Sequence, residues 1–432
     1  MNDLLTSTPG VTSGFARKAS RFWSIFCNPV IQIVFGVGFT VILPVLVRWP
    51  ELLVTFDLRD WLLVTAVGCM LSFAAGNLIT RQILRFPMAQ GSSHVVPTLL
   101  ICFAILFGIL VMGRFEFSRY LIITSFILSV IWCLAYVHGL NRMRRLTLGI
   151  VPFGTARNLT FDQKVASSVV IGPDRSIAGC DAVVADLRAD LPGPWERFLA
   201  DCALARVPVY HVKQIHEWLT GRVHIEHLSE NQFGSLLVPR YYEMFKRVVD
   251  LLLALILSPL LIVIVGTIAI LIKLEGGGPI FFVQQRMGFR GTTFRMIKFR
   301  TMHPEHQGLD YTVADDDRVT RLGKYLRRHR LDELPQVINI LRGDMSWIGP
   351  RPESLALAEW YERDVPFYRY RHIVRPGISG WAQVHQGQTA GLNEAMEKLQ
   401  FDFFYIKHFS PWLDLLIAMK SAKILLTGHG AR

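Results

Sequence analysis

An acidic pair, Asp332 and Glu333, lies in a dense block of charged residues, RRHRLDELPQVINILRGDMSWIGPRP, which spans 327–352. A carboxylate can attack a phosphoryl group if it stays ionised and nearby cations neutralise the phosphate charge. Pro335 is tolerated only near a helix start, so a helix that begins near Asp332 places both carboxylates among free N–H groups that favour anions. The block predicts phosphoryl chemistry, although an isolated Asp-Glu pair is more often only a helix cap.

Basic side chains elsewhere in the sequence are candidates for holding the phosphates. Arg351 lies in GPRP, where its guanidinium fork matches a diphosphate, and a surface salt bridge is an equally good interpretation. Lys298 and Arg300 alternate with apolar residues as they would in a half-buried strand. We therefore expect both of them on one face of that strand, in contact with phosphate.

Adjacent carboxylates also predict a metal ion. Two neighbouring negative charges repel each other, and a divalent cation relieves that repulsion while it attracts a diphosphate. Carboxylate oxygens combined with substrate phosphates favour Mg²⁺ over zinc. We expect Asp332 and Glu333 to bind Mg²⁺, and the sequence leaves open whether Glu333 binds the ion or handles a proton.

The apolar segments that must position this charged site predict a membrane protein. The 432 residues are 51% hydrophobic with a mean hydropathy of +0.33, too apolar for a wholly soluble chain. Four apolar runs approach the length of roughly 20 residues that a bilayer demands. They predict a cytoplasmic segment, 1–28, and a bundle of four transmembrane helices, 29–144. The four runs cover about 30–47, 61–80, 96–113 and 120–138.

The distribution of basic residues predicts how the bundle is oriented. Basic clusters precede the first run and follow the fourth, so both ends of the bundle are expected in the cytoplasm. The net charge of +12 suits anionic lipid and anionic substrates, and no nucleic-acid-binding motif accompanies it. No ionisable residue lies inside the four cores. We therefore expect the bundle to serve as an anchor and as the surface of a homodimer, not as a transporter.

Residues 145–238 predict a small α/β, Rossmann-like module in the cytoplasm. Short β-branched runs alternate with a helical pattern there. Neither GxGxxG nor GxxxxGK[ST] occurs, so a packing or dimerising role is favoured over nucleotide binding. No chemistry is assigned to this module.

A fifth apolar run, 248–273, contains Ser258 and Pro259 near its middle. Proline removes a backbone donor and bends a helix, and the serine can hydrogen-bond the carbonyl that is freed. Basic residues at both ends disfavour a simple crossing. We expect a re-entrant helix, 246–273, that keeps a catalytic domain, 239–432, in the cytoplasm. An ordinary kinked spanning helix is the alternative.

Four ordered stretches resemble the bacterial sugar transferase family, the monotopic polyprenyl-phosphate hexose-1-phosphate transferases. They read KRVVDLLLALILSPLL, GGPIFFVQQRMGFRGTTFRMIKFRTM, RVTRLGKYLRRHRLDELPQVINILRGDMSWIGPRP and YRYRHIVRPGISGWAQV. With the preceding bundle and module, the chain is similar to the longer members, the undecaprenyl-phosphate galactose or glucose phosphotransferases. The resemblance implies a mainly α-helical catalytic domain whose re-entrant helix breaks at Ser258 and Pro259.

The resemblance also implies a reaction and roles for residues. A UDP-hexose would give its sugar phosphate to Asp332 as nucleophile, with Glu333 as its partner, and release UMP. Undecaprenyl phosphate at the inner leaflet would then accept the hexose-1-phosphate from this covalent intermediate, as the first membrane step of exopolysaccharide, capsule or O-antigen assembly. Arg327, five residues before Asp332, would bind phosphate. Because that spacing is about 140° on one continuous helix, the chain must bend between the two residues. The implied location is the bacterial inner membrane.

Two other interpretations compete with this phosphotransferase. A non-catalytic membrane protein that regulates polysaccharide assembly would account for the helices and the α/β module but not for the acidic pair. A polytopic polyprenyl-phosphate sugar-phosphate transferase without a covalent step would need many more spans than the sequence contains. The sequence does not decide whether the sugar is glucose, galactose or an N-acetyl sugar.

Overall fold

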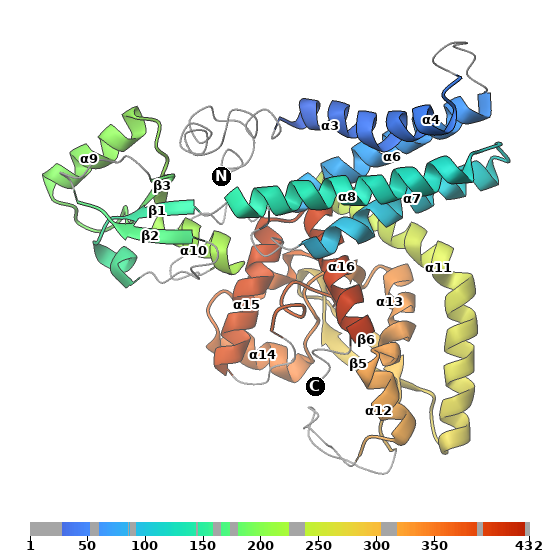
Figure 1. The fold of residues 1–432 in the computed structure, drawn as a ribbon. Coiled ribbons are helices and arrows are strands. Elements are labelled where there is room, and N and C mark those ends of the chain that lie inside the picture. Colours follow the sequence, from blue (N-terminus) through green and yellow to red (C-terminus); the bar gives the residue numbers. More distant parts are fainter. Residues whose placement is uncertain are drawn as a thin grey trace. The chain divides into compact units, whose positions relative to one another are not determined.

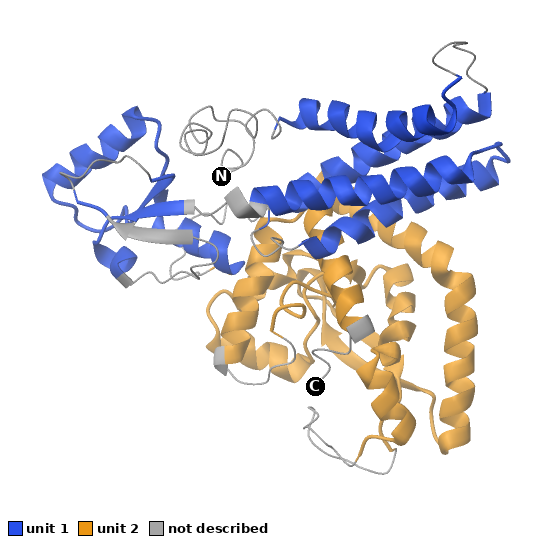
Figure 2. Cartoon of the chain, in the orientation of Figure 1, with its two compact units in different colours: residues 1–221 blue, residues 222–432 orange. Residues whose placement is uncertain are grey.

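The computed structural model divides the chain into two compact units, residues 1–221 and 222–432 (Figure 2). Unit 1 holds long apolar helices and an α/β module, and unit 2 holds the residues predicted to do chemistry. The structure describes residues 28–51, 60–84, 86, 92–143, 146–158, 166–172, 180–223, 238–303, 318–386 and 392–427.

Unit 1 begins with four apolar helical stretches (Figure 1). Each is 20 to 24 residues long with a mean hydropathy between 1.9 and 2.8, so each is long and apolar enough to cross a bilayer. Large side chains such as Phe73, Leu99 and Leu121 are buried between them. The elements are α3 (Pro29–Val37), η2 (Gly38–Ile42), α4 (Leu43–Arg48), α6 (Asp60–Ile83), η4 (Ser92–His94), α7 (Val95–Met112) and α8 (Arg119–Met143).

An α/β module completes unit 1. Its four strands form a parallel sheet in the order β2-β1-β3-β4, and separate apolar clusters include Ile215 of α10 and Phe198 of α9. Parallel strands need crossover connections, which here include the helices. The described elements are β1 (Leu146–Ile150), η5 (Gly154–Asn158), β2 (Ala166–Val170), β3 (Ala182–Ala185), α9 (Gly193–Leu204), β4 (Val209–His211) and α10 (Val212–Thr220).

Unit 2 begins with a 36-residue helix, α11 (Arg240–Glu275), which changes direction about half way along (Figure 1). Pro259 lies inside this helix and cannot donate to the carbonyl of Leu255. The Ser258 hydroxyl donates to that carbonyl instead, at 2.7 Å. This is the hydrogen bond that the sequence predicted, and it compensates the break locally. Together with the stretches of unit 1, α11 brings the helices of membrane-spanning length to five among the described residues.

The two arms of α11 pack against different parts of unit 2. Ala254, on the first arm, lies in a cluster with Met296, Ile340 and Met345. On the second arm, Ile268 and Ile272 join a cluster with Phe299 and Leu326. The following elements are β5 (Phe281–Met287), η8 (Phe289–Gly291), β6 (Thr293–Phe299), α12 (Arg321–Arg328), η9 (Leu331–Gln336), α13 (Val337–Arg342), β7 (Ser346–Ile348), α14 (Leu355–Asp364), η10 (Tyr368–Ile373), β8 (Gly377–Ser379), α15 (Leu392–Lys407) and α16 (Pro411–Thr427).

The strands of unit 2 form two small sheets within an otherwise helical domain. The β5 and β6 strands pair as an antiparallel hairpin, and β7 pairs with β8 in parallel. A mainly helical domain agrees with the expectation from the sequence. Strand β6 carries Lys298, and β7 ends just before the loop that carries Arg351.

Candidate active site

The acidic pair lies in a sharp bend between two helical segments. Helix α12 ends at Arg328, and Arg330 has a φ of 52°, in the left-handed region that interrupts a helix. The short helix η9 then begins at Leu331 and carries Asp332 and Glu333 in its first turn. The chain therefore bends between Arg327 and the acidic pair, which the resemblance required.

Glu333 is buried and forms an ion pair with Arg351. The Nη2 atom of Arg351 lies 2.8 Å from Oε1 of Glu333, and the glutamate residue is only 6% exposed. Burial alone would raise the pKa of Glu333, but the charge and hydrogen bond of Arg351, together with the charges of Arg330 and Lys298, outweigh burial and lower it. Glu333 is therefore ionised, and its interaction with Arg351 holds η9 against the GPRP loop.

Asp332 has the opposite electrostatic balance. Burial and the neighbouring charge of Glu333 raise its pKa to about 6, although Lys298, Arg351 and Arg327 oppose the shift. The two carboxylates thus titrate as a pair in which Glu333 loses its proton first. At neutral pH Asp332 is mostly ionised, and its raised pKa gives it greater basicity than an exposed aspartate.

The β5–β6 hairpin brings Lys298 to the acidic pair. Lys298 lies on β6 opposite Phe282, with its Nζ 5.5 Å from the centre of the phenyl ring. Burial and the charges of Arg286 and Arg351 lower the pKa of Lys298 to about 8, against the attraction of the two carboxylates. A partly desolvated ammonium group in this position can bind phosphate near neutral pH.

Of the other predicted basic residues, Arg327 interacts with the acidic pair, whereas Arg300 binds backbone carbonyls elsewhere. Arg327 donates from Nε to the hydroxyl of Thr301 at 2.8 Å, and its charge acts on Asp332. Arg300 follows the end of β6 and donates to the carbonyls of Gly277 at 2.7 Å and Gly276 at 3.2 Å. The structure thus brings Lys298, Arg327 and Arg351 to the pair, whereas Arg300 fixes the turn after α11.

Two glycines hold the GPRP loop close to the RPGISG segment. A β-carbon on Gly377 would lie 2.1 Å from the backbone nitrogen of Gly349, and one on Gly349 would lie 2.4 Å from the carbonyl of Arg375. No other residue fits either position without backbone movement. This close approach sets where the loop that carries Arg351 leaves strand β7.

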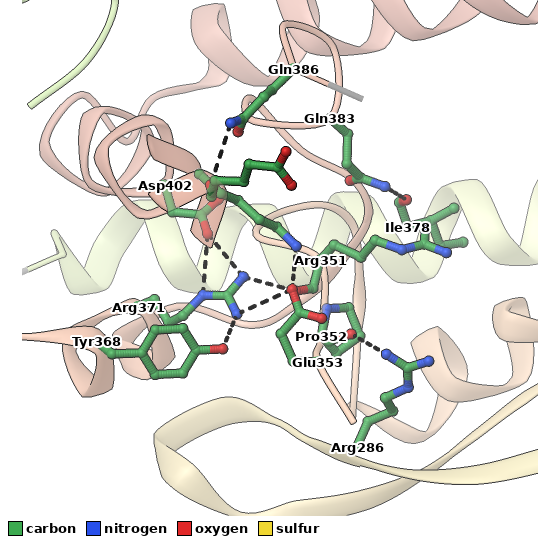
Figure 3. A network of polar contacts seen from close by, with 12 residues as sticks. Arg286, Arg351, Pro352, Glu353, Tyr368, Arg371, Ile378, Gln383, Gln386 and Asp402 are labelled. Atoms are coloured by element: carbon green, nitrogen blue, oxygen red, sulfur yellow. Dashed lines mark hydrogen bonds and ion pairs between the residues drawn. The ribbon is translucent and has the colours of Figure 1, made fainter. Parts of the chain in front are cut away.

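A buried polar network, which the sequence did not reveal, holds the same loop from the other side (Figure 3). Arg371 donates to the carbonyl of Arg351 and to the carboxylate of Asp402, both at 2.8 Å, and to the hydroxyl of Tyr368 at 2.7 Å. Arg286 donates to the carbonyl of Pro352 at 2.9 Å. The backbone that carries the Arg351 side chain is therefore fixed by the buried Arg371 and the half-buried Arg286.

The acidic pair contains an oxygen atom that could bind a cation. Oε2 of Glu333 is buried and has no hydrogen-bond partner among the described residues. Clusters of three or more His, Cys, Asp and Glu side chains suited to a metal do not occur in the described part of the chain. The residues present fit Mg²⁺, which commonly binds through one or two carboxylates and completes its shell with substrate phosphates and water.

Together these groups suit transfer of a phosphoryl group through a carboxylate. The site combines an ionisable carboxylate, a second carboxylate held by a guanidinium group, and cations that can neutralise a diphosphate. A solvated helix cap would need none of these features. The arrangement favours the catalytic interpretation over the cap.

Comparison with known proteins agrees with this chemistry. The family described as bacterial sugar transferase matches residues 241–428. A UDP-N-acetylgalactosamine-undecaprenyl-phosphate N-acetylgalactosaminephosphotransferase from Aeromonas hydrophila is 42% identical over 424 residues, which cover 97% of this chain and 100% of the relative. A UDP-glucose:undecaprenyl-phosphate glucose-1-phosphate transferase from Caulobacter vibrioides is 42% identical over 190 residues, 43% of this chain and 71% of the relative. The protein of the same name from Escherichia coli K12 is 40% identical over 199 residues, 44% of this chain and 43% of the relative.

Proposed function

The chain belongs to the bacterial sugar transferase family and is a phosphotransferase; on this basis we propose that it transfers a sugar 1-phosphate from a UDP-sugar to undecaprenyl phosphate and releases UMP. The observation that carries the proposal is the buried pair in which Arg351 holds Glu333 and leaves Asp332 among cations. We further propose a UDP-N-acetylhexosamine as donor, because the relative that matches nearly the whole chain bears that specificity in its name.

The proposed reaction has two steps at one phosphorus atom. A carboxylate oxygen of Asp332 forms a bond to the phosphorus that carries the sugar, and the bond from this phosphorus to the bridging oxygen breaks, so that UMP leaves. A phosphate oxygen of undecaprenyl phosphate then attacks the same phosphorus. The bond to Asp332 breaks, Asp332 returns as a carboxylate, and the sugar leaves as a lipid-linked diphosphate. This product would begin the assembly of an exopolysaccharide, capsule or O-antigen.

Each charged side chain has a distinct role in this proposal. Arg351 keeps Glu333 ionised and fixed, so that the charge of Glu333 raises the basicity of Asp332. Lys298 and Arg327 bind phosphate oxygens of the donor. Asp332 and Glu333 would hold Mg²⁺, which neutralises charge on the diphosphate when bound. Arg300, which is engaged with the backbone after α11, is left as a scaffold residue.

We also propose that α11 enters the cytoplasmic leaflet of the inner membrane and returns, so that the domain after it stays in the cytoplasm. Support comes from the bend at Pro259, from the serine that compensates it, and from basic residues near both ends of the helix. The homodimer that the sequence suggested stays a prediction. Labelling of a cysteine that replaces the exposed Arg328, in inside-out and right-side-out vesicles, tests the topology; labelling from the periplasmic side alone would contradict it.

The experiment that tests the function uses the full chain, solubilised with Mg²⁺ and a panel of UDP-sugars. With polyprenyl phosphate, we expect continuous release of UMP, fastest with a UDP-N-acetylhexosamine. Without the acceptor, we expect at most one UMP per chain and a phospho-sugar adduct on the peptide that contains Asp332. Turnover by an Asp332→Asn variant at the wild-type rate would overturn the covalent step, and no UMP from any UDP-sugar would favour the non-catalytic alternative.

A further inference from the structure

The hairpin that carries Lys298 begins with apolar side chains that the protein leaves uncovered. Phe281, Phe282 and Val283, the first three residues of β5, are all exposed, and Phe282 is 46% exposed. The end of α11, six residues earlier in the chain, also exposes apolar residues, among them Leu271 and Leu274. Exposed apolar side chains therefore lie both at the end of the membrane-type helix α11 and at the start of the hairpin.

Successive residues of β5 point to opposite faces of the hairpin, and the two faces have different neighbours. Phe281 stacks on Phe299 with ring centres 5.6 Å apart, and Phe299 packs against Ile268 and Ile272 of α11. Phe282 instead lies opposite Lys298, whose charge interacts with Asp332 and Glu333. Phe282 is thus the exposed apolar group of β5 that lies beside the ammonium group of the candidate site.

A half-exposed phenyl ring beside a phosphate-binding ammonium group matches an amphiphile. In a UDP-sugar the phosphates lie between two polar groups, the sugar and the nucleoside. In a polyprenyl phosphate the apolar chain begins one oxygen atom away from the phosphate. A ring 5.5 Å from the Lys298 ammonium group can therefore contact the first isoprene units while the ammonium group binds the lipid's phosphate.

We propose that, once UMP has left, Phe282 and Lys298 form the binding site for the lipid acceptor, with the ring against the first isoprene units and the ammonium group, which bound the donor in the first step, on the acceptor's phosphate. This inference rests on the proposed function and adds the position of the second substrate. The exposed apolar side chains at the end of α11 and at the start of the hairpin then lead the isoprenoid chain toward Lys298. The sugar-bearing phosphorus is approached from the side of the hairpin.

The two half-reactions separate this inference from the function on which it rests. In Phe282→Ser, formation of the phospho-sugar adduct from the UDP-sugar alone should keep its wild-type rate and amplitude. The KM for undecaprenyl phosphate should rise about tenfold, as expected for loss of one apolar contact of this size, with kcat little changed. Phe282→Leu should restore most of the affinity because it keeps the apolar surface.

Val283→Ser is the matched control. Val283 is the next residue, it is 52% exposed, and it faces away from Lys298. It should leave the KM for the acceptor unchanged. Equal increases of the acceptor KM in Phe282→Ser and Val283→Ser would show a general contact with lipid and would overturn the binding site. A slower first half-reaction in Phe282→Ser would overturn it too, and so would an unchanged acceptor KM in that variant. A wild-type chain that releases no UMP would overturn the function, and the acceptor site with it.

Discussion

Both units contain a buried acid that is paired with a basic side chain, yet the two acids differ in how completely their oxygens are hydrogen-bonded. Asp186, at the end of β3 in unit 1, accepts from the Thr155 hydroxyl at 2.6 Å, the Thr155 N–H at 2.9 Å and the Arg188 N–H at 3.2 Å. His211 lies 3.5 Å away. In unit 2, Glu333 accepts from Arg351 through one oxygen, and its other oxygen has no hydrogen-bond partner within the described residues.

The pKa directions follow from these contacts. Burial raises the pKa of Asp186, but the hydrogen bonds from Thr155 and Arg188 outweigh burial and lower it. For Asp332, burial and Glu333 together raise the pKa to about 6. Backbone and hydroxyl donors therefore make the carboxylate of Asp186 a structural element of its module. In the acidic pair, by contrast, one oxygen of Glu333 has no hydrogen-bond partner among the described residues, and the charge of Glu333 helps to raise the pKa of Asp332.

Replacement of aspartate by asparagine should have its most different effects on activity at Asp332 and Asp186. Asp332→Asn removes the nucleophile and should lower UMP release by at least about a thousandfold. Asp186→Asn should stay within about threefold of the wild-type rate, because its contacts lie inside the α/β module. The measurement is steady-state UMP release, normalised to folded protein. A comparable loss in Asp186→Asn would show that unit 1 takes part in catalysis.

Removal of the charge of Arg351, which pairs with Glu333, should give the next largest loss of activity. Arg351→Met leaves Glu333 as a buried charge without its ion pair, so we expect roughly a hundredfold loss in kcat/KM for the UDP-sugar. The loss of positive charge should also raise the pKa of Asp332 and move the acidic limb of the pH profile upward. Arg363→Met is the matched control, since Arg363 is highly exposed and its ion pair within the described residues is with the neighbouring Asp364. An unmoved acidic limb in Arg351→Met would contradict the proposed coupling.

The pH profile of the wild-type chain should have two limbs. Activity should fall below about pH 6, where Asp332 gains a proton, and above about pH 8, where Lys298 loses its charge. The value to measure is kcat/KM for the UDP-sugar, which reports on the free enzyme. Lys298→Arg should move the alkaline limb upward because a guanidinium keeps its charge. If the alkaline limb does not move in Lys298→Arg, it reports on the titration of a group other than Lys298.

The smallest expected effects are changes in melting temperature, which should have opposite signs for substitutions at Asp332 and Asp186. Because the folded state raises the pKa of Asp332, the ionised group destabilises the fold at pH 8, and Asp332→Asn should raise the melting temperature by a few degrees. This gain should vanish as the pH falls toward 4. Asp186 has a lowered pKa, so Asp186→Asn should lower the melting temperature at pH 8 by roughly similar amounts. Melting curves at both pH values test this, and equal signs would contradict it.

The sequence predicted features that depend on local chemistry. The apolar helices, the break at Ser258 and Pro259, and the helix start at Asp332 follow from composition and from what proline can do. Features that depend on contacts between distant segments could not be read in the same way. Arg371 lies in YRYRH and looks like a surface residue, yet it meets Asp402, 31 residues away, in a buried pair.

Spacing alone also could not separate Lys298 from Arg300. Both follow the period of a strand, but Arg300 lies beyond the end of β6 and reaches the carbonyls after α11. The distinction depends on where the strand ends and on the turn before it. Phe282 was part of the motif from the start, and the role proposed for it depends on the hairpin register, which pairs it with Lys298.

The bend in α11 has a mechanical consequence for strand β6. The first arm packs against Met296 and the second against Phe299, and these two residues lie on either side of Lys298 in the same strand, β6. The bent helix therefore braces this strand from both of its arms, so that the position of the ammonium group depends on the angle at Pro259.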